Sequence, residues 1–170
     1  RVLDPRPDTE TLVEWALEVV EKIVSPRVAD LGTGSGAIAL AVQSQRPDAA
    51  VTAVDFSPEA LEVARANAQR LQLPVRLVHS CWLEQVDGVF DAIVSNPPYI
   101  AADDQHLAAL RHEPRSALVS GDDGLDFTRI ILRESGRHLK PKGLLVVEIG
   151  NNRDALEQAF RGQARQLAGN

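Results

Sequence analysis

The sequence contains no methionine and only one cysteine, Cys81, among its 170 residues. A single cysteine cannot form an internal disulfide, and this cysteine usage is typical of a reducing compartment. The longest apolar run, residues 143–147, is far shorter than the ~20 residues of a membrane span, and the N-terminus has no signal-peptide pattern. We therefore expect a cytoplasmic protein without a membrane partner. The missing methionine indicates a piece of a longer product.

Positive charge is also scarce, because 18 Lys and Arg residues stand against 24 Asp and Glu residues and leave a net charge of −6. Proteins that bind nucleic acid normally carry a basic face, so this balance argues against a nucleic-acid partner. The four histidines show no metal-ligand spacing, and no metal site is expected. With 44% hydrophobic and 25% charged residues, the composition is typical of one globular domain, which we expect to be a monomer.

Helix-like and strand-like segments alternate along the chain. Helical patterns predict helices in residues 9–24, 37–46, 57–71, 125–139 and 152–160. Short apolar runs predict strands in residues 27–31, 50–55, 74–79, 90–95 and 143–150. Ser57 and Pro58 are residue types that favour the cap and the first turn of a helix. This alternation, with nearly continuous apolar strands, predicts an α/β fold in which helices cover both faces of a mostly parallel sheet.

The segment after the first predicted strand, DLGTGSGAIAL, is rich in glycine. Gly32, Gly34 and Gly36 let the backbone turn sharply and approach a ligand, and the next helix directs free N–H groups toward it. Ligands of such sheets bind beyond the carboxyl ends of the strands. The segment also fits a loosened dinucleotide-binding pattern, whereas the absence of Gly-Lys-Ser/Thr excludes a P-loop. A glycine turn that only packs a helix on a strand is the alternative.

Polar and aromatic residues follow the next two predicted strands. Asp55 ends the second strand, 19 positions after Gly36. At about this offset, nucleotide-binding α/β folds place an acid that accepts hydrogen bonds from ribose hydroxyls. Asp55 alone could be a solvated acid, but together with the glycine loop it favours a ribose-bearing cofactor. Trp82 follows the third strand and fits two interpretations equally well, a ring stacked on a purine and a core residue.

The fourth predicted strand runs into the segment NPPY, residues 96–99. Pro97 and Pro98 cannot extend the strand because they have no N–H, and they leave their carbonyls as acceptors. Asn96 adds an amide oxygen, and Tyr99 adds a flat ring. Two acceptors and a ring suit a planar NH2 group, whose nitrogen is a poor nucleophile and must be positioned against a reactive electrophile. The alternative is a rigid turn without chemistry.

In combination, DLGTGSG, Asp55 and NPPY resemble the class I S-adenosylmethionine-dependent methyltransferases that act on planar nitrogens. PRPDTETLVEWAL near the start and RHEPRSALVSGDDGLD after NPPY resemble one branch, the protein-glutamine N5-methyltransferases. The resemblance covers about residues 1–160 and implies a Rossmann-like domain that uses S-adenosylmethionine. Its implied substrate is the glutamine of the Gly-Gly-Gln motif in peptide-chain release factors, or a glutamine of a large-subunit ribosomal protein.

The resemblance also implies roles for individual residues. The methionine part of the cofactor would be held by Gly32, Thr33, Gly34, Ser35 and Gly36. Asp55 would hold the ribose, and Trp82 would lie by the adenine. The substrate glutamine would be bound by Asn96, Pro97, Pro98 and Tyr99. Of these, Asn96, Pro97 and Tyr99 would orient it for transfer, and Asn96 would also lie near the cofactor.

The chain departs from the family pattern at several places. At Cys81 the family often has an acid that can take the adenine amino group. EIGNNRDALEQAF is more similar to the ribosomal-protein branch, whereas PRPDTE is more similar to the release-factor branch. We expect the family's last antiparallel strands and its N-terminal helical docking domain to be absent, so that residues 1–170 form the cofactor-binding domain alone. The alternative functions are N-methylation of a nucleic-acid amino group and a non-catalytic nucleotide-binding or dinucleotide-binding module.

Overall fold

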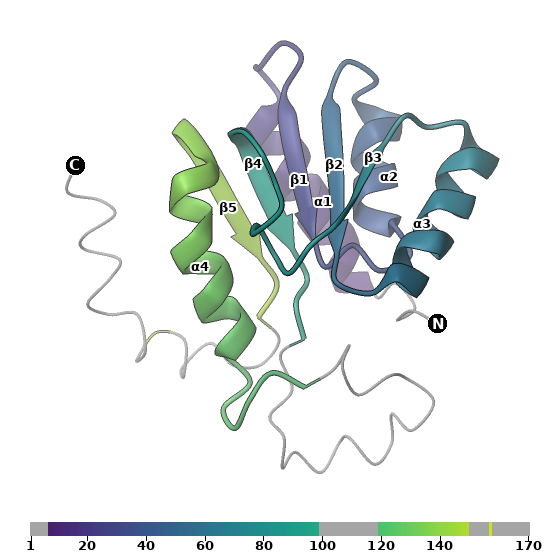
Figure 1. Ribbon diagram of the computed structural model, residues 1–170. Helices are drawn as coiled ribbons and strands as arrows, with labels where there is room; N and C mark the ends of the chain where they lie inside the picture. The colour runs from purple at the N-terminus through teal and green to yellow at the C-terminus, as the bar shows by residue number, and fades with distance from the viewer. Residues whose placement is uncertain (1–6, 99–118, 150–156, 158–170) are drawn as a thin grey trace.

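A computed structural model of the chain describes residues 7–98, 119–149 and 157. In this part of the chain, helices and strands alternate in the predicted order (Figure 1). The helices are α1 (Pro7–Val20), α2 (Ala37–Gln45), α3 (Pro58–Leu71) and α4 (Asp126–His138). The strands are β1 (Arg27–Leu31), β2 (Ala50–Asp55), β3 (Arg76–His79), β4 (Phe90–Ser95) and β5 (Leu139–Val147). No helix within these ranges is long and apolar enough to cross a membrane.

The five strands form one parallel sheet with the order β3-β2-β1-β4-β5, which confirms the predicted fold class. β1, β2 and β3 are added in one direction, and the chain then returns to place β4 on the other side of β1. The strand order therefore reverses between β1 and β4. In sheets of this kind, ligands bind outside the carboxyl ends of the strands at this switch point.

Two hydrophobic clusters cover the two faces of the sheet. On one face, α1 and α2 pack on side chains that include Val28, Val51 and Val94. On the other face, Ile131 of α4 packs with Leu31 and Ile93, and this cluster also includes residues of the β3–β4 connection. Figure 1 shows α1 and α4 on opposite sides of the sheet. Every residue of β4 is buried, which agrees with its apolar residues Phe90, Ala92, Ile93 and Val94, and its two polar residues, Asp91 and Ser95, are buried as well.

Local sequence signals account for the ends of α3. The Ser57 hydroxyl accepts a hydrogen bond from the Ala60 N–H at 3.1 Å, and Pro58 stands at the first helical position. These are the predicted cap and first-turn residues, and they are confirmed. The helix ends where Gln72 takes a left-handed conformation with φ of 54°.

β5 begins at Leu139, earlier than the predicted start at residue 143. The first residues of β5 include Lys140 and Pro141, which interrupt the apolar pattern that the prediction used. They join the sheet at a register shift between Phe90 and Ala92, and the Lys140 ammonium bonds the Asp91 carboxylate at 2.8 Å. The predicted helix in residues 152–160 lies almost wholly outside the described residues.

Candidate active site

The glycine loop follows β1 at the switch point. The N–H groups of Gly32 and Thr33 both donate to the Val54 carbonyl at 2.9 Å, so the loop turns back over the end of β2. Gly36 has φ of +84°, and a Cβ atom there would lie 3.2 Å from the Cβ of Ala64. Glycine is therefore needed at this position both for the backbone conformation and for the close approach of α3. The Asn67 side chain of α3 donates to the Ser35 carbonyl at 2.9 Å and fixes the loop from the same side.

Asp30 holds the glycine loop from below. Its side chain is fully buried, and one carboxylate oxygen accepts from the Thr33 hydroxyl at 2.6 Å and from the Ala39 N–H at 3.2 Å. Its other oxygen, Oδ1, is buried and has no hydrogen-bond partner among the described residues. Burial raises the pKa of Asp30 from 3.8 to about 6, in spite of the two donors, which act in the opposite direction. Asp30 thus supports the loop and does not offer an accessible oxygen to a ligand.

Asp55 connects the ends of β2 and β1. Its carboxylate accepts from the Gly34 N–H at 2.8 Å through one oxygen and from the Ser57 N–H at 2.9 Å through the other. A carboxylate can accept about four hydrogen bonds, so capacity remains on both oxygens. Asp55 is also half-exposed. The predicted ribose acceptor therefore lies directly against the predicted glycine loop.

Trp82 lies over the glycine loop, in the connection between β3 and β4. A Cβ atom added to Gly32 would lie 3.6 Å from the Trp82 ring, and on its other side the ring contacts Phe127 at 5.2 Å between centroids. Trp82 has φ of +50°, which is unusual for a bulky residue. The Leu83 N–H, which donates to the Glu134 carboxylate at 3.1 Å, ties this strained turn to α4. Trp82 is half-buried and packs against the core, so its ring can form one wall of the site.

The segment that begins at Asn96 leaves the sheet beside the glycine loop. The hydroxyl of the buried Ser95 donates to the Leu31 carbonyl at 2.7 Å, and the Ser95 carbonyl accepts from the Glu148 N–H at 3.0 Å. Both neighbouring strands therefore fix the point at which Asn96 begins. Asn96 and Pro98 are half-buried and Pro97 is buried, whereas Tyr99 lies outside the described residues.

Three residues at this end of the sheet were missed in the sequence. Asp30 was missed because its hydrogen bonds to the loop depend on the fold, although it is the first residue of DLGTGSG. Phe56 follows Asp55, and 72% of its surface is exposed. His79 ends β3, and its Nε2 lies 2.8 Å from the Phe56 carbonyl. A signal for Phe56 was its place directly after the predicted ribose acceptor. A contact between residues 56 and 79 cannot be read from spacing.

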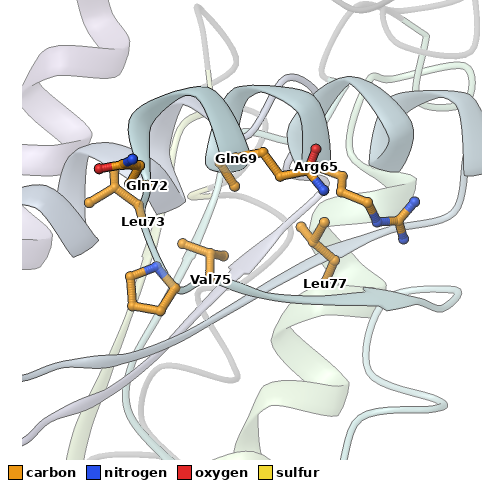
Figure 2. Close-up of a pocket in the computed structure, with 8 residues that line it drawn as sticks. Arg65, Gln69, Gln72, Leu73, Val75 and Leu77 are labelled. Atoms are coloured by element: carbon orange, nitrogen blue, oxygen red, sulfur yellow. The ribbon is translucent and has the colours of Figure 1, made fainter.

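A groove lies on the protein surface away from this site. It is an open groove of about 480 Å³ between the C-terminal half of α3 and the segment that leads into β3 (Figure 2). Its polar wall is formed by Arg65, Gln69 and Gln72, and its apolar wall by Leu73, Pro74, Val75 and Leu77. Because residue 76 is the first residue of β3, the groove is at the amino end of that strand. The predicted cofactor and substrate residues within the described ranges all lie at the opposite, carboxyl ends of the strands.

Comparison with known proteins gives a consistent result. The family model described as the methyltransferase small domain matches residues 9–168. A release factor glutamine methyltransferase from Deinococcus radiodurans is 46% identical over 151 residues, which are 88% of this chain and 54% of that relative. A release factor glutamine methyltransferase from Xylella fastidiosa, strain Temecula1, is 53% identical over 152 residues, 87% of this chain and 55% of that relative. The chain thus spans about half the length of these relatives.

A solved structure has a similar fold. The crystal structure of ribosomal protein L11 methylase from Lactobacillus delbrueckii subsp. bulgaricus matches with a TM-score of 0.63 and 26% sequence identity. The match covers 92% of this chain and 68% of that chain.

Proposed function

Because the chain belongs to the methyltransferase small domain family, we propose that it binds S-adenosylmethionine at the carboxyl ends of the strands and methylates a glutamine side chain in a protein. The proposed substrate is the Gly-Gly-Gln glutamine of a peptide-chain release factor, in the cytoplasm. One observation carries this proposal. The hydrogen bond from the Ser95 hydroxyl to the Leu31 carbonyl places Asn96 and Pro97, which follow Ser95, directly beside the glycine loop, which follows Leu31. An electrophile held by the loop and an amide held at Asn96 would therefore be neighbours.

The residues at the switch point fit S-adenosylmethionine. Gly36 keeps the loop free of a side chain where α3 approaches, and Asp55 retains acceptor capacity for two ribose hydroxyls. Phe56 offers an exposed aromatic face next to Asp55, and Trp82 offers a half-buried ring on the other side of the glycine loop. These two rings are suited to the apolar faces of a base. When bound, S-adenosylmethionine supplies a reactive methyl group on a sulfonium.

The protein's own contribution is orientation. The Asn96 side-chain oxygen and the Pro97 carbonyl would accept the two N–H bonds of the substrate amide, and Tyr99 would pack on its plane. An amide nitrogen is a weak nucleophile, so the rate enhancement must come from holding it in the correct orientation toward the methyl group. Losing this orientation can lower the rate of transfer on the order of 100-fold. No general base is required before transfer, because the alkylated nitrogen is more acidic and can release its proton to water.

The reaction is tested with S-adenosylmethionine that carries a labelled methyl group. Purified release factor, large-subunit ribosomal protein and a DNA oligonucleotide are offered separately, together with a release factor whose Gly-Gly-Gln glutamine is replaced by alanine. We expect label in the release factor and none in its alanine variant. Label in the ribosomal protein would show that the substrate is a ribosomal-protein glutamine instead of a release-factor glutamine. Label in the oligonucleotide would overturn protein-glutamine methylation.

Cofactor identity is tested separately by thermal unfolding. S-adenosylhomocysteine should raise the midpoint, because a ligand at 100 times its Kd stabilises the folded state by about 2.7 kcal/mol. NAD should leave it unchanged. A shift with NAD alone would instead favour a dinucleotide-binding module.

A further inference from the structure

An exposed aromatic pair stands at the edge of the proposed cofactor site. Phe56 has 72% of its surface exposed and follows Asp55 directly. The rings of Phe56 and His79 are 6.2 Å apart between centroids, with an angle of 40° between their planes. The Nε2 atom of His79 lies 2.8 Å from the Phe56 carbonyl oxygen. His79 thus contacts both the ring and the peptide of Phe56.

The chemistry of this contact fixes its direction. A carbonyl oxygen can only accept, so His79 must carry a hydrogen on Nε2 and donate it. The next residue, Ser80, donates its backbone N–H to the Asp55 carbonyl at 3.0 Å. Asp55 and His79 are the last paired residues of the β2–β3 ladder. The hydrogen bond from His79 to the Phe56 carbonyl therefore links the two chain segments one residue beyond the end of the ladder.

We propose that His79 is a positioning residue for the base-binding end of the cofactor site, because it holds the Phe56 peptide and ring where they cover one face of the adenine. This inference rests on the proposed function, since it takes S-adenosylmethionine as the ligand.

The need for this role follows from the other groups near the base. Cys81, two residues after His79, offers only a thiol at this edge of the proposed site, and a thiol is a weak hydrogen-bond acceptor. Partial burial and the carboxylates of Glu84 and Glu134 raise the pKa of the Cys81 thiol, so that it stays neutral. With hydrogen-bond recognition weak, base affinity depends more on apolar contact. An exposed ring contributes most when its rotation is already restricted before binding.

A purely structural role for His79 predicts a different result. His79 and Phe56 are both exposed, and a hydrogen bond at the surface contributes little to the free energy of unfolding. If His79 acted only on the fold, its loss would lower the unfolding midpoint and leave the affinity of the folded protein for the ligand unchanged. If it positions Phe56, its loss weakens binding with the midpoint nearly unchanged.

The experiment is a double-mutant cycle on affinity for S-adenosylhomocysteine, measured by calorimetry. His79→Leu replaces the imidazole donor by an apolar side chain, and His79→Gln restores a donor of similar reach. We expect His79→Leu to weaken binding roughly 2- to 13-fold, which corresponds to the about 0.5–1.5 kcal/mol of an aromatic pair. His79→Gln should recover part of that loss. In a Phe56→Ala background, His79→Leu should change affinity by less than about twofold.

Kinetics give a second readout. His79→Leu should raise KM for S-adenosylmethionine and leave kcat unchanged at saturation, because the lost contact is equal in the ground state and the transition state. Equal loss in the Phe56 and Phe56→Ala backgrounds would overturn the inference, and so would full affinity in folded His79→Leu. If the parent protein itself fails to bind S-adenosylhomocysteine, the proposed function fails and this inference falls with it, a result distinct from the other two.

Discussion

Asp30 is the buried acid whose ionisation opposes folding. Its pKa is raised to about 6 in the folded protein, against an ordinary value of 3.8. The folded state therefore binds more protons at Asp30 between these values, so the contribution of Asp30 to stability is greatest below pH 3.8 and is lost as pH rises through about 6. The full loss from this group is about 3 kcal/mol at 1.36 kcal/mol per pKa unit.

We predict that Asp30→Asn removes this part of the pH dependence. The amide oxygen can still accept from Thr33 and Ala39, but it carries no charge to desolvate. Relative to the parent, the variant should gain up to about 3 kcal/mol of stability between pH 4 and pH 8. Urea unfolding at a series of pH values measures this, with the exposed Asp87→Asn as the matched control. If the free energy of unfolding of Asp30→Asn and that of the parent changed with pH in parallel, the pKa of Asp30 would not be raised in the folded protein.

Asp55 combines a structural and a binding role. Its two bonds to the N–H groups of Gly34 and Ser57 mean that Asp55→Ala loses loop contacts as well as ribose acceptors. We predict a folded variant whose affinity for S-adenosylhomocysteine is lower by about 1.5–3 kcal/mol, the contribution of hydrogen bonds to a charged group. Calorimetry measures the affinity, and Asp87→Ala controls for the loss of one negative charge. Unchanged affinity in the folded Asp55→Ala variant would remove Asp55 from the site.

At the scale of elements, the two tryptophans lie in different surroundings. Trp15 of α1 has 54% of its surface exposed, whereas Trp82 is half-buried between Gly32 and Phe127. We predict that cofactor binding changes the fluorescence of Trp82 and leaves that of Trp15 unchanged. The signal should persist in Trp15→Phe and vanish in Trp82→Phe. The reverse pattern would make Trp82 a core residue with no part in binding.

The segment that follows β4 is tested by changing Asn96. Asn96→Ala removes one acceptor, so it should bind S-adenosylhomocysteine nearly normally and lose most methyl transfer to glutamine. Asn96→Asp keeps an acceptor of the same size and should retain partial activity. Asn96→Ser should fall between them, because its hydroxyl reaches less far. Transfer by folded Asn96→Ala at the parental rate would show that NPPY is only a stiff turn.

Sequence patterns predict elements well where burial is uniform and less well where single contacts decide. β4 was predicted at its observed bounds because all six of its residues are buried and four of them, Phe90, Ala92, Ile93 and Val94, are apolar. β5 was predicted in residues 143–150 and is observed at Leu139–Val147. Its start was missed because Lys140 and Pro141 break the apolar pattern, and the Lys140–Asp91 ion pair at that end of the strand joins residues 49 apart. The contact between the glycine loop and Asp55 was predictable because both lie at the carboxyl ends of neighbouring parallel strands. The His79–Phe56 contact was not, because it depends on the pairing of β2 with β3.

At the scale of the whole molecule, the proposed site consists of four turns that the sequence keeps far apart. These turns are residues 32–36, 55–57, 79–83 and 95–98, and the parallel sheet brings them together at the carboxyl ends of its strands. The groove beside α3 lies at the other end of β3 (Figure 2), so one small ligand cannot occupy both the groove and the proposed site.

Amide hydrogen exchange can distinguish ligand binding at the proposed site from ligand binding in the groove beside α3. We predict that S-adenosylhomocysteine slows exchange in residues 32–36, 55–57 and 79–83 and at Asn96, and leaves Leu73 and Val75 of the groove unchanged. Short labelling times are needed, because local openings then dominate over the global stabilisation that any bound ligand produces. The Asp55→Ala variant at the same ligand concentration is the control, since weaker binding should reduce protection in all four turns together. Protection confined to residues 32–36 would mean that the turns do not act as one site. Protection confined to the groove would place the ligand beside α3 and remove the glycine loop from its binding.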